Sequence, residues 1–297
     1  MPATPDRAAL LRAMPLVFVL IWSTGFIVAR YGMPHAPPMK FLAVRYALSI
    51  ACFGLWLLFA RAAWPRGGAQ WWHLAVTGAL MHGGYLGGVW AAVKAGLGAG
   101  AVALIVGLQP VLTALWLAFA ARDGERVSVR QWAGLALGFG GLVLVVGPKL
   151  GASEIGPWTL ALAALALLSI TVGTLYQKRH VRACDVRTAS CVQLLAALLV
   201  TAPLALLEAE AMDWQPALIG SMAWSVLGLT LGGASLLYLL IQRGATTSVT
   251  ALLYLVPPCT AAMAWLLFAE PLTPAVLIGF AVTAAGVALV VRAPATG

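Results

Sequence analysis

The chain has 297 residues, of which 62% are hydrophobic and only 9% are charged, and its mean hydropathy is +0.95. A soluble domain carries roughly 25% charged residues, so this composition excludes an ordinary soluble enzyme and indicates a protein that crosses a lipid bilayer several times. The net charge of +9 does not indicate a nucleic-acid partner, because the basic residues follow a membrane-topology pattern.

Ten stretches of the chain contain no Asp, Glu, Lys or Arg, and nine of them reach the length of about 17–25 residues that a bilayer-spanning helix needs. They cover 13–29, 46–60, 67–93, 95–121, 131–148, 155–177, 188–207, 214–242, 244–269 and 271–291. The short window, 46–60, reaches span length only if Arg45 is drawn into its helix. We therefore predict an all-α membrane protein with ten transmembrane helices joined by short connections.

The second half of the chain repeats the first. At an offset of 148 residues the matching pairs are Gly25 and Gly173, Gly84 and Gly232, Gly96 and Gly244, and Pro110 and Pro258; at an offset of 145 they are Gly134 and Gly279, and Gly141 and Gly286. Residues 1–150 and 151–297 are thus predicted to be two five-helix repeats. Five is an odd number, so the second repeat enters the membrane inverted, an arrangement typical of transporters with a substrate site near the midplane.

Basic residues gather in alternate connections. With the N-terminus inside, the inner segments hold thirteen Lys or Arg residues and the outer segments hold four, Arg30, Lys40, Lys94 and Lys149. This positive-inside bias places both termini in the cytoplasm.

Candidate substrate-binding residues are the polar, aromatic and proline residues predicted near the midplane, where a polar group is costly unless it has a function. They are Trp22, Ser23, His82, Tyr85, Gln109, Pro110, Ser169, Tyr254 and Pro258. His82 and Tyr85 share a helix face, and a proline inside a span frees a carbonyl that can line a cavity. Each of these residues also has a plain packing interpretation.

Two short hairpins at repeat-related positions are candidate gates. The outer one, 94–100, contains Lys94 and Gly96, and its partner at 242–248 contains Gly244. Arg45 is the one basic residue inside a span. We expect it to extend outward to water; the alternative is that it attracts a substrate carboxylate near the outer vestibule.

Other functions are disfavoured by what the predicted spans contain. A phosphorylated substrate would require Lys or Arg at the midplane, and an enzyme would require clustered acids, histidines or a nucleophile with its base. No metal site or cofactor is predicted. All nine acids fall in connections or tails, which predicts facilitated diffusion, with proton coupling through His82 as the alternative.

Two stretches resemble a known family. Residues 22–30 (WSTGFIVAR) with Pro37, Pro38 and Arg45, and Ala103 to Pro110 with 124–126 (GER) and Gly134, are similar to the EamA-type members of the drug/metabolite transporter superfamily. The resemblance implies a bacterial inner-membrane exporter of small metabolites. The first segment and the 90–94 hairpin are most similar to exporters of aromatic and other neutral amino acids. The alternative is a proton-coupled drug or metabolite exporter of the same superfamily. Ten helices suffice for a complete pathway, so a monomer is expected.

Overall fold

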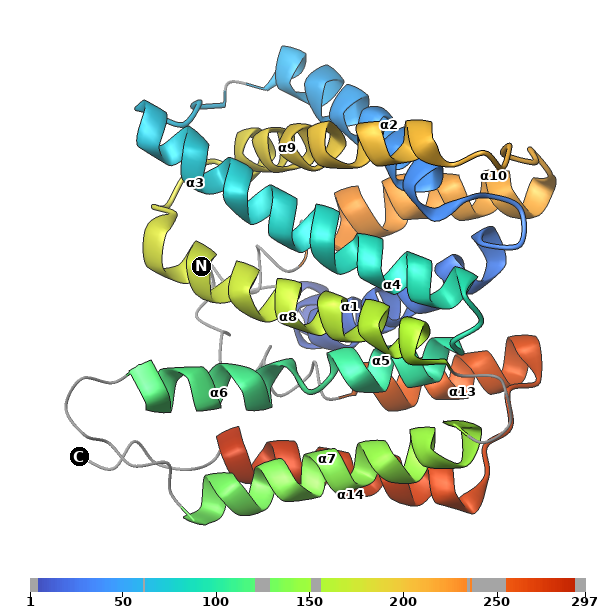
Figure 1. Cartoon of the computed structure of the whole chain (residues 1–297). Coiled ribbons are helices and arrows are strands. Elements are labelled where there is room, and N and C mark those ends of the chain that lie inside the picture. The colour runs from blue at the N-terminus through green and yellow to red at the C-terminus, as the bar shows by residue number, and fades with distance from the viewer. Residues whose placement is uncertain are drawn as a thin grey trace.

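The computed structural model describes residues 5–60, 62–120, 129–150, 156–233, 236 and 255–291. Within these ranges the chain is helical and contains no strand (Figure 1). Four helical segments are long and apolar enough to cross a membrane: Pro38–Phe59, Pro157–His180, Val186–Leu207 and Pro216–Gly233. Shorter apolar helices include Ala99–Thr113, Val256–Phe268 and Pro274–Leu289. The predicted all-helical membrane class is therefore confirmed for the described part of the chain.

The described residues form fourteen helical elements. Their bounds are α1 Pro5–Gly32, α2 Pro38–Phe59, α3 Gly68–Gly78, η1 Ala79–Gly84, α4 Tyr85–Lys94, α5 Ala99–Val106, α6 Gln109–Ala120, α7 Val129–Leu150, α8 Pro157–His180, α9 Val186–Leu207, α10 Pro216–Ala223, η2 Trp224–Gly233, α13 Val256–Phe268 and α14 Pro274–Val291. The elements η1 and η2 are π-helical; η1 joins α3 to α4, and η2 extends α10, without a connection between them.

Proline and glycine mark the limits of several helices. Pro38, Pro157 and Pro216 stand in the first turn of α2, α8 and α10, where the missing N–H group has no helical partner to lose. Gly96 has a φ of +100° between α4 and α5, a conformation that side chains other than glycine rarely adopt. The prolines thus mark where three helices begin, and Gly96 marks the turn between α4 and α5.

The helical segment 99–120 is interrupted between α5 and α6. Pro110 has no N–H group to donate to the carbonyl of Val106, so regular helix bonding cannot continue through this point. A Cβ atom on Gly107 would lie 2.9 Å from Cγ of Pro257. The interruption therefore packs closely against the first turn of α13, and only a residue without a side chain fits there.

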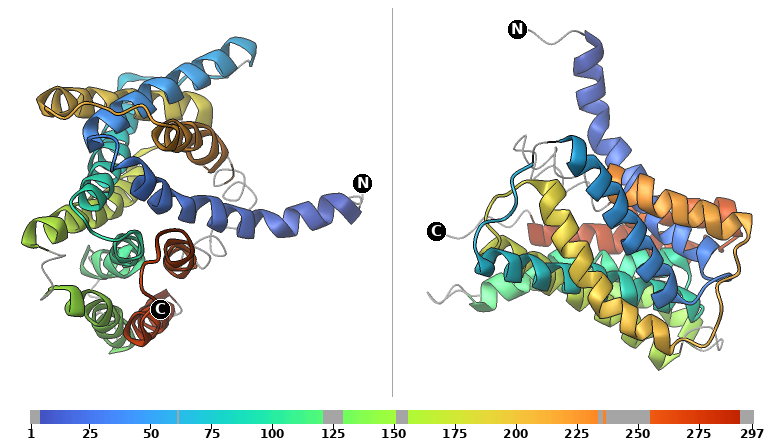
Figure 2. Two further views of the ribbon diagram at one scale, coloured as in Figure 1. Left: turned by 90° about the vertical axis from the view of Figure 1, so that its right-hand side faces the viewer. Right: turned by 90° about the horizontal axis from the view of Figure 1, so that it is seen from above.

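Two helix pairs form opposite edges of the bundle, α2 with α9 and α7 with α14 (Figures 1 and 2). The α7–α14 pair is antiparallel, because Gly134 in α7 meets Gly286 in α14 whereas Gly141 meets Gly279. Glycines at these crossings allow close backbone contact. Between the two edges lies the largest buried apolar cluster, to which α1, α2, α4, α5, α8 and α9 contribute.

Candidate functional site

A cavity of about 250 Å³ lies between helices of the two halves of the chain. This volume is close to the lower end of the range for small-molecule sites, roughly 300–1,000 Å³. The first half contributes Trp22, Gly25, Phe26, Arg45, Met81, His82, Tyr85, Leu86, Val89 and Trp90. The second half contributes Ile170, Gln177, Val186, Ala189, Ser190, Gln193, Leu194, Leu229 and Thr230.

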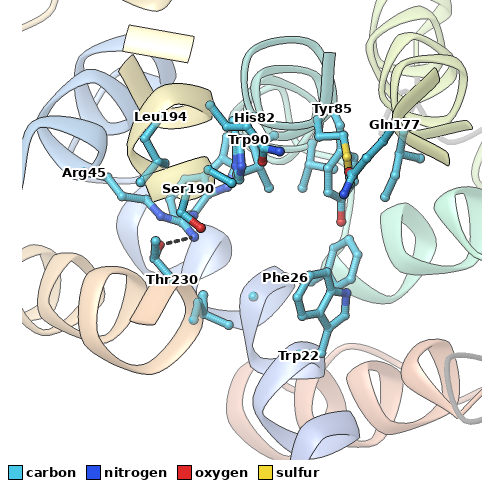
Figure 3. A pocket seen from close by; sticks show the side chains of 18 of the residues that line it. Trp22, Phe26, Arg45, His82, Tyr85, Trp90, Gln177, Ser190, Leu194 and Thr230 are labelled. Atoms are coloured by element: carbon cyan, nitrogen blue, oxygen red, sulfur yellow. Dashed lines mark hydrogen bonds between the residues drawn. The ribbon is translucent and has the colours of Figure 1, made fainter. Parts of the chain in front are cut away.

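The cavity wall is largely apolar and aromatic, with a few polar groups on opposite sides. Arg45, Ser190 and Thr230 lie together on one side, and Trp22 and Phe26 lie across the opening from them (Figure 3). The ring of Trp22 packs against the ring of Phe18, with 5.3 Å between the ring centroids. Such a wall suits a small molecule with one apolar part and one polar part.

Both π-helices place residues in the cavity. His82 comes from η1, and its backbone carbonyl accepts a hydrogen bond of 2.7 Å from the hydroxyl of the buried Tyr46 in α2. Thr230 comes from η2, and its hydroxyl donates to the carbonyl of Ser225, five residues earlier, at 2.9 Å. Short π-helical segments within α-helices are frequent at functional sites, and here they occur at equivalent positions of the two halves.

Arg45 is buried and belongs to the cavity wall, with 6% of its surface exposed. Its Nη2 donates to Oγ1 of Thr230 at 3.2 Å, and its guanidinium carbon lies 5.9 Å from the ring centroid of Trp90. The expectation that Arg45 extends outward to water is therefore wrong. The argument against a phosphorylated substrate assumed that no Lys or Arg lies where the substrate would bind, and Arg45 in the cavity wall removes that assumption.

Three of the predicted substrate-binding residues lie together in the cavity wall: Trp22, His82 and Tyr85. Four others lie in helix packing. Ser23 is fully buried and donates to the carbonyl of Val19 at 2.7 Å, and Gln109 donates to Thr174 at 3.1 Å. Ser169 packs against Gly84 where α8 meets η1, and Pro110 stands in the first turn of α6, directly after the interruption.

The predicted substrate-binding residue Pro258 is exposed on α13. Its neighbour Pro257 is buried and faces Gly107. Tyr254 and the gating candidate Gly244 lie outside the described residues.

Lys94, the first gating candidate, joins the two halves at one end of the bundle. Its Nζ lies 2.6 Å from Oε1 of Glu210 and donates to the carbonyl of Met33 at 2.9 Å. The carboxylate of Glu208 accepts from the backbone N–H groups of Met39 and Lys40 at 3.0 and 2.8 Å, which caps the N-terminus of α2.

The side chain of Lys40 then reaches the carbonyl of Glu210 at 2.7 Å. We call Lys40, Lys94, Glu208 and Glu210 the clasp.

Two further polar contacts between the halves lie at the same end of the bundle. Glu270, just after α13, accepts from the backbone N–H of Ala99 at 3.2 Å, and its carboxylate lies 4.0 Å from Arg30. His35 and Asp213 lie 3.6 Å apart. The short turn at Gly96 precedes Ala99, so the hairpin at 94–100 is held at both of its ends by carboxylates from the second half.

Sequence reasoning passed over several cavity residues, including Phe26, Trp90, Gln177, Ser190, Gln193 and Thr230. The internal repeat contained a signal for some of them. At the offset of 148, Trp22 corresponds to Ile170, Arg45 to Gln193 and His82 to Thr230, and all six of these residues line the cavity. Within the described residues no group of three or more His, Cys, Asp or Glu side chains is arranged to hold a metal ion.

Comparison with known proteins places these observations in a family. The model of the EamA-like transporter family matches twice, at residues 12–147 and 157–292. A protein of Bacillus subtilis (strain 168) named "Uncharacterized transporter YvbV" is 26% identical over 96% of this chain and 91% of its own. A solved crystal structure covering 95% of this chain and 97% of its own has a TM-score of 0.64 at 18% identity, which shows a shared fold alone.

Proteins of Salmonella typhimurium (strain LT2) and Escherichia coli (strain K12), each named "Probable amino-acid metabolite efflux pump", are 26% and 25% identical. The matched region is 56% of this chain, and the chain spans only about half, 52%, of those two relatives. With both halves of the chain matched by the family model around a cavity lined by apolar helices, the protein belongs to the EamA-like transporter family.

Proposed function

We propose that the protein exports small apolar metabolites, above all aromatic and other neutral amino acids, across a bacterial inner membrane by alternating access. The observation that carries this proposal is the cavity between the halves, with Trp22 and Phe26 on one side and the polar groups of Arg45 and Thr230 on the other. An amino acid also has an apolar part and a polar part, which match the two sides of the cavity wall. The relatives named as amino-acid metabolite efflux pumps support the class of substrate.

The architecture that we propose is ten transmembrane helices in two inverted five-helix repeats, residues 1–150 and 151–297. The double match of the family model supports the two repeats. The antiparallel α7–α14 pair supports the inversion, because Gly134 and Gly141 correspond in the repeat to Gly279 and Gly286, and the observed contacts are Gly134 with Gly286 and Gly141 with Gly279. A two-fold axis in the membrane plane produces this exchange of partners.

For the orientation we propose that both termini face the cytoplasm, which puts the clasp on the outer side. There the hairpin with Lys94 and Gly96 would form the outer gate, and the repeat-related hairpin with Gly244 the inner one. The ion pair between Lys94 and Glu210 supports a gate at this end, since it ties the two halves together where they must separate for release. One chain contains a complete pathway in this scheme, and the working unit is a monomer.

The test is transport in proteoliposomes with a radiolabelled panel of amino acids, sugars, purines and cationic drugs. We expect flux of phenylalanine and other neutral amino acids. Trp22→Ala should reduce phenylalanine flux by about tenfold, because the loss of an aromatic contact of about 1–1.5 kcal/mol corresponds to this factor. Trp158→Ala, at an exposed position on α8, is the matched control and should leave the flux unchanged.

Flux of cationic drugs alone would overturn the amino-acid assignment and favour the alternative, a proton-coupled drug exporter of the same superfamily. Equal loss of flux in Trp22→Ala and Trp158→Ala would contradict a specific role of the cavity.

A further inference from the structure

Arg45 is the only residue with a fixed charge among the described residues that line the cavity. It sits in α2 with 6% of its surface exposed, and its Nε is buried without a hydrogen-bond partner. Of its other donors, Nη2 is satisfied by the hydroxyl of Thr230. A guanidinium group has five N–H donors and remains protonated, so much of its binding capacity is unused.

A buried charge of this kind is costly unless an opposite charge compensates it. The five acidic residues whose side chains the structure describes all have other partners. Asp185 pairs with Arg187, Glu208 accepts from the backbone of α2, and Glu210 pairs with Lys94. Asp213 contacts His35 and Gln215, and Glu270 contacts Arg30 and the backbone of Ala99. Residues 234–254, of which the structure describes only 236, contain no Asp or Glu in the sequence. The sequence places Asp6 in the first turn of α1, and Asp123, Glu125 and Glu154 in connections between helices.

The surroundings of Arg45 orient its guanidinium group toward the cavity. Trp90, stacked on Phe41 with ring centroids 4.3 Å apart, covers one side of it. The hydroxyl of Thr230, itself held by the carbonyl of Ser225, fixes one of the terminal nitrogens. A planar guanidinium held in this way is suited to a carboxylate, which it binds through two parallel hydrogen bonds.

We propose that Arg45 binds the carboxylate of the transported molecule, while the apolar part of that molecule lies against Trp22 and Phe26. This inference rests on the proposed export function and names the group that the site recognises. A monocarboxylate fits better than a phosphate, because no second Lys or Arg is present among the described cavity residues to balance a second negative charge. Thr230 acts as a positioning residue through its hydrogen bond to Arg45.

The test measures ligand binding to the purified full-length protein by thermal unfolding in detergent, with probes that differ in one group. The probes are 3-phenylpropionate, its neutral amide 3-phenylpropanamide, and inorganic phosphate. We expect the wild type to bind the carboxylate about 10- to 100-fold more tightly than the amide, the effect of a hydrogen-bonded charge pair. Arg45→Gln should lose this preference, and Arg45→Lys should retain part of it.

Arg66→Gln, which removes an exposed arginine outside the cavity, is the matched control and should keep the full preference. Equal affinity of the wild type for 3-phenylpropionate and its amide would overturn the proposal without any variant, and so would an Arg45→Gln protein that retains the preference. Phosphate binding as tight as that of 3-phenylpropionate would overturn the choice of an apolar monocarboxylate.

A second measurement separates this inference from the export function. Proteoliposome flux is compared for phenylalanine and phenylalaninamide. Carboxylate binding through Arg45 without flux of any amino acid would contradict the export function and leave the carboxylate site in place. Equal flux of both compounds, unaltered in ratio by Arg45→Gln, would contradict the carboxylate site and leave the export function in place.

Discussion

Lys94 Nζ lies 2.6 Å from Oε1 of Glu210, and this ion pair joins the end of α4 in the first half of the chain to the connection between α9 and α10 in the second. The other clasp contacts, from Glu208 to the start of α2 and from Lys40 to the carbonyl of Glu210, also bridge the halves. The two halves are therefore fastened at this end by polar groups, whereas between them lies a mainly apolar cavity.

The first prediction is that the Lys94→Met variant opens at the clasp end of the bundle more often than the parent protein does. A half-exposed ion pair contributes about 0.2–1 kcal/mol, so access to the cavity should rise about 1.5- to 5-fold. The reporter is Ser190→Cys in the cavity wall, on a background without Cys52, Cys184, Cys191 and Cys259. Its labelling rate is measured with a membrane-impermeant maleimide added from the clasp side.

High salt should raise the labelling rate of the parent protein in the same direction, because it screens the ion pair. Lys178→Met, which removes an exposed lysine from the last turn of α8, is the control and should have no effect. An unchanged or slower labelling rate in Lys94→Met would contradict a clasp that holds this end closed.

The second prediction concerns the glycine contact between α7 and α14. A Cβ on Gly141 would lie within 3 Å of the carbonyl oxygen of Gly279 and of the backbone nitrogen of Thr283, whereas a Cβ on the adjacent Gly140 would meet nothing within 4 Å. Gly141→Ala should therefore destabilise the protein by about 1–3 kcal/mol, because the helices must separate. Gly140→Ala should stabilise it slightly, by about 0.5–1 kcal/mol, through helix propensity. Unfolding in mixed micelles measures both, and equal effects would rule out this contact.

The third prediction concerns Asp185, which precedes α9 and accepts from the backbone N–H of Arg187 at 2.9 Å. The hydrogen bond from the Arg187 side chain holds the pKa of this carboxyl below its usual value of 3.8. Since the pKa is lower in the folded state, the stabilisation is present above pH 3.8 and is lost as the pH falls through the folded-state pKa.

Asp185→Ala should consequently cost about 0.5–2 kcal/mol at neutral pH, the usual effect of removing an N-cap. The difference in unfolding free energy from the wild type should shrink at acidic pH. Neither Asp185→Ala nor Asp185→Asn has a titrating group at this position, so the acid-dependent loss of stability should be seen in the wild type and be absent from both variants. Asp185→Asn keeps an acceptor oxygen for the N-cap, so it should cost less than Asp185→Ala at neutral pH. A difference that stays constant from pH 7 to acid would contradict the assignment to this carboxylate.

The fourth prediction concerns energy coupling. No carboxylate lines the cavity among the described residues, and a driving ion usually requires an ionisable site where substrate binding can sense it. We therefore expect an imposed pH gradient to drive no uphill accumulation of substrate in proteoliposomes, while downhill flux proceeds. Accumulation that a protonophore collapses would establish proton coupling. If His82→Ala then abolished accumulation and preserved downhill exchange, the coupling would belong to that histidine.

The candidate residues show how far sequence reasoning reaches into the site. Trp22, His82 and Tyr85 were predicted because they are polar or aromatic near the middle of an apolar segment, and all three line the cavity. Ser23 and Gln109 met the same criterion, but Ser23 donates to the carbonyl of Val19 in its own helix and Gln109 donates to Thr174 in α8, and neither side chain lines the cavity. Depth along a helix can be read from the sequence, whereas the direction of a side chain around the helix depends on how the helices pack.

Arg45 illustrates the same limit for electrostatics. From the sequence, an arginine near the end of an apolar window was expected to reach water along the shortest path. In the structure its side chain is enclosed by Trp90 and Thr230. Thr230 comes from the other half of the chain, 185 residues away, and it is brought into reach by packing between α2 and η2.

The sequence by itself determined the membrane class, the helical character of the chain and the family. The signals for these are the low charge, the long apolar windows and the repeated glycine and proline positions, and all of them can be read from the linear order of residues. Only the tertiary structure decided that Arg45 belongs to the cavity, that Pro257 and not Pro258 meets Gly107, and that Lys94 pairs with Glu210. Each of these depends on the relative rotation and register of helices far apart in sequence, which are set by the close packing of both halves.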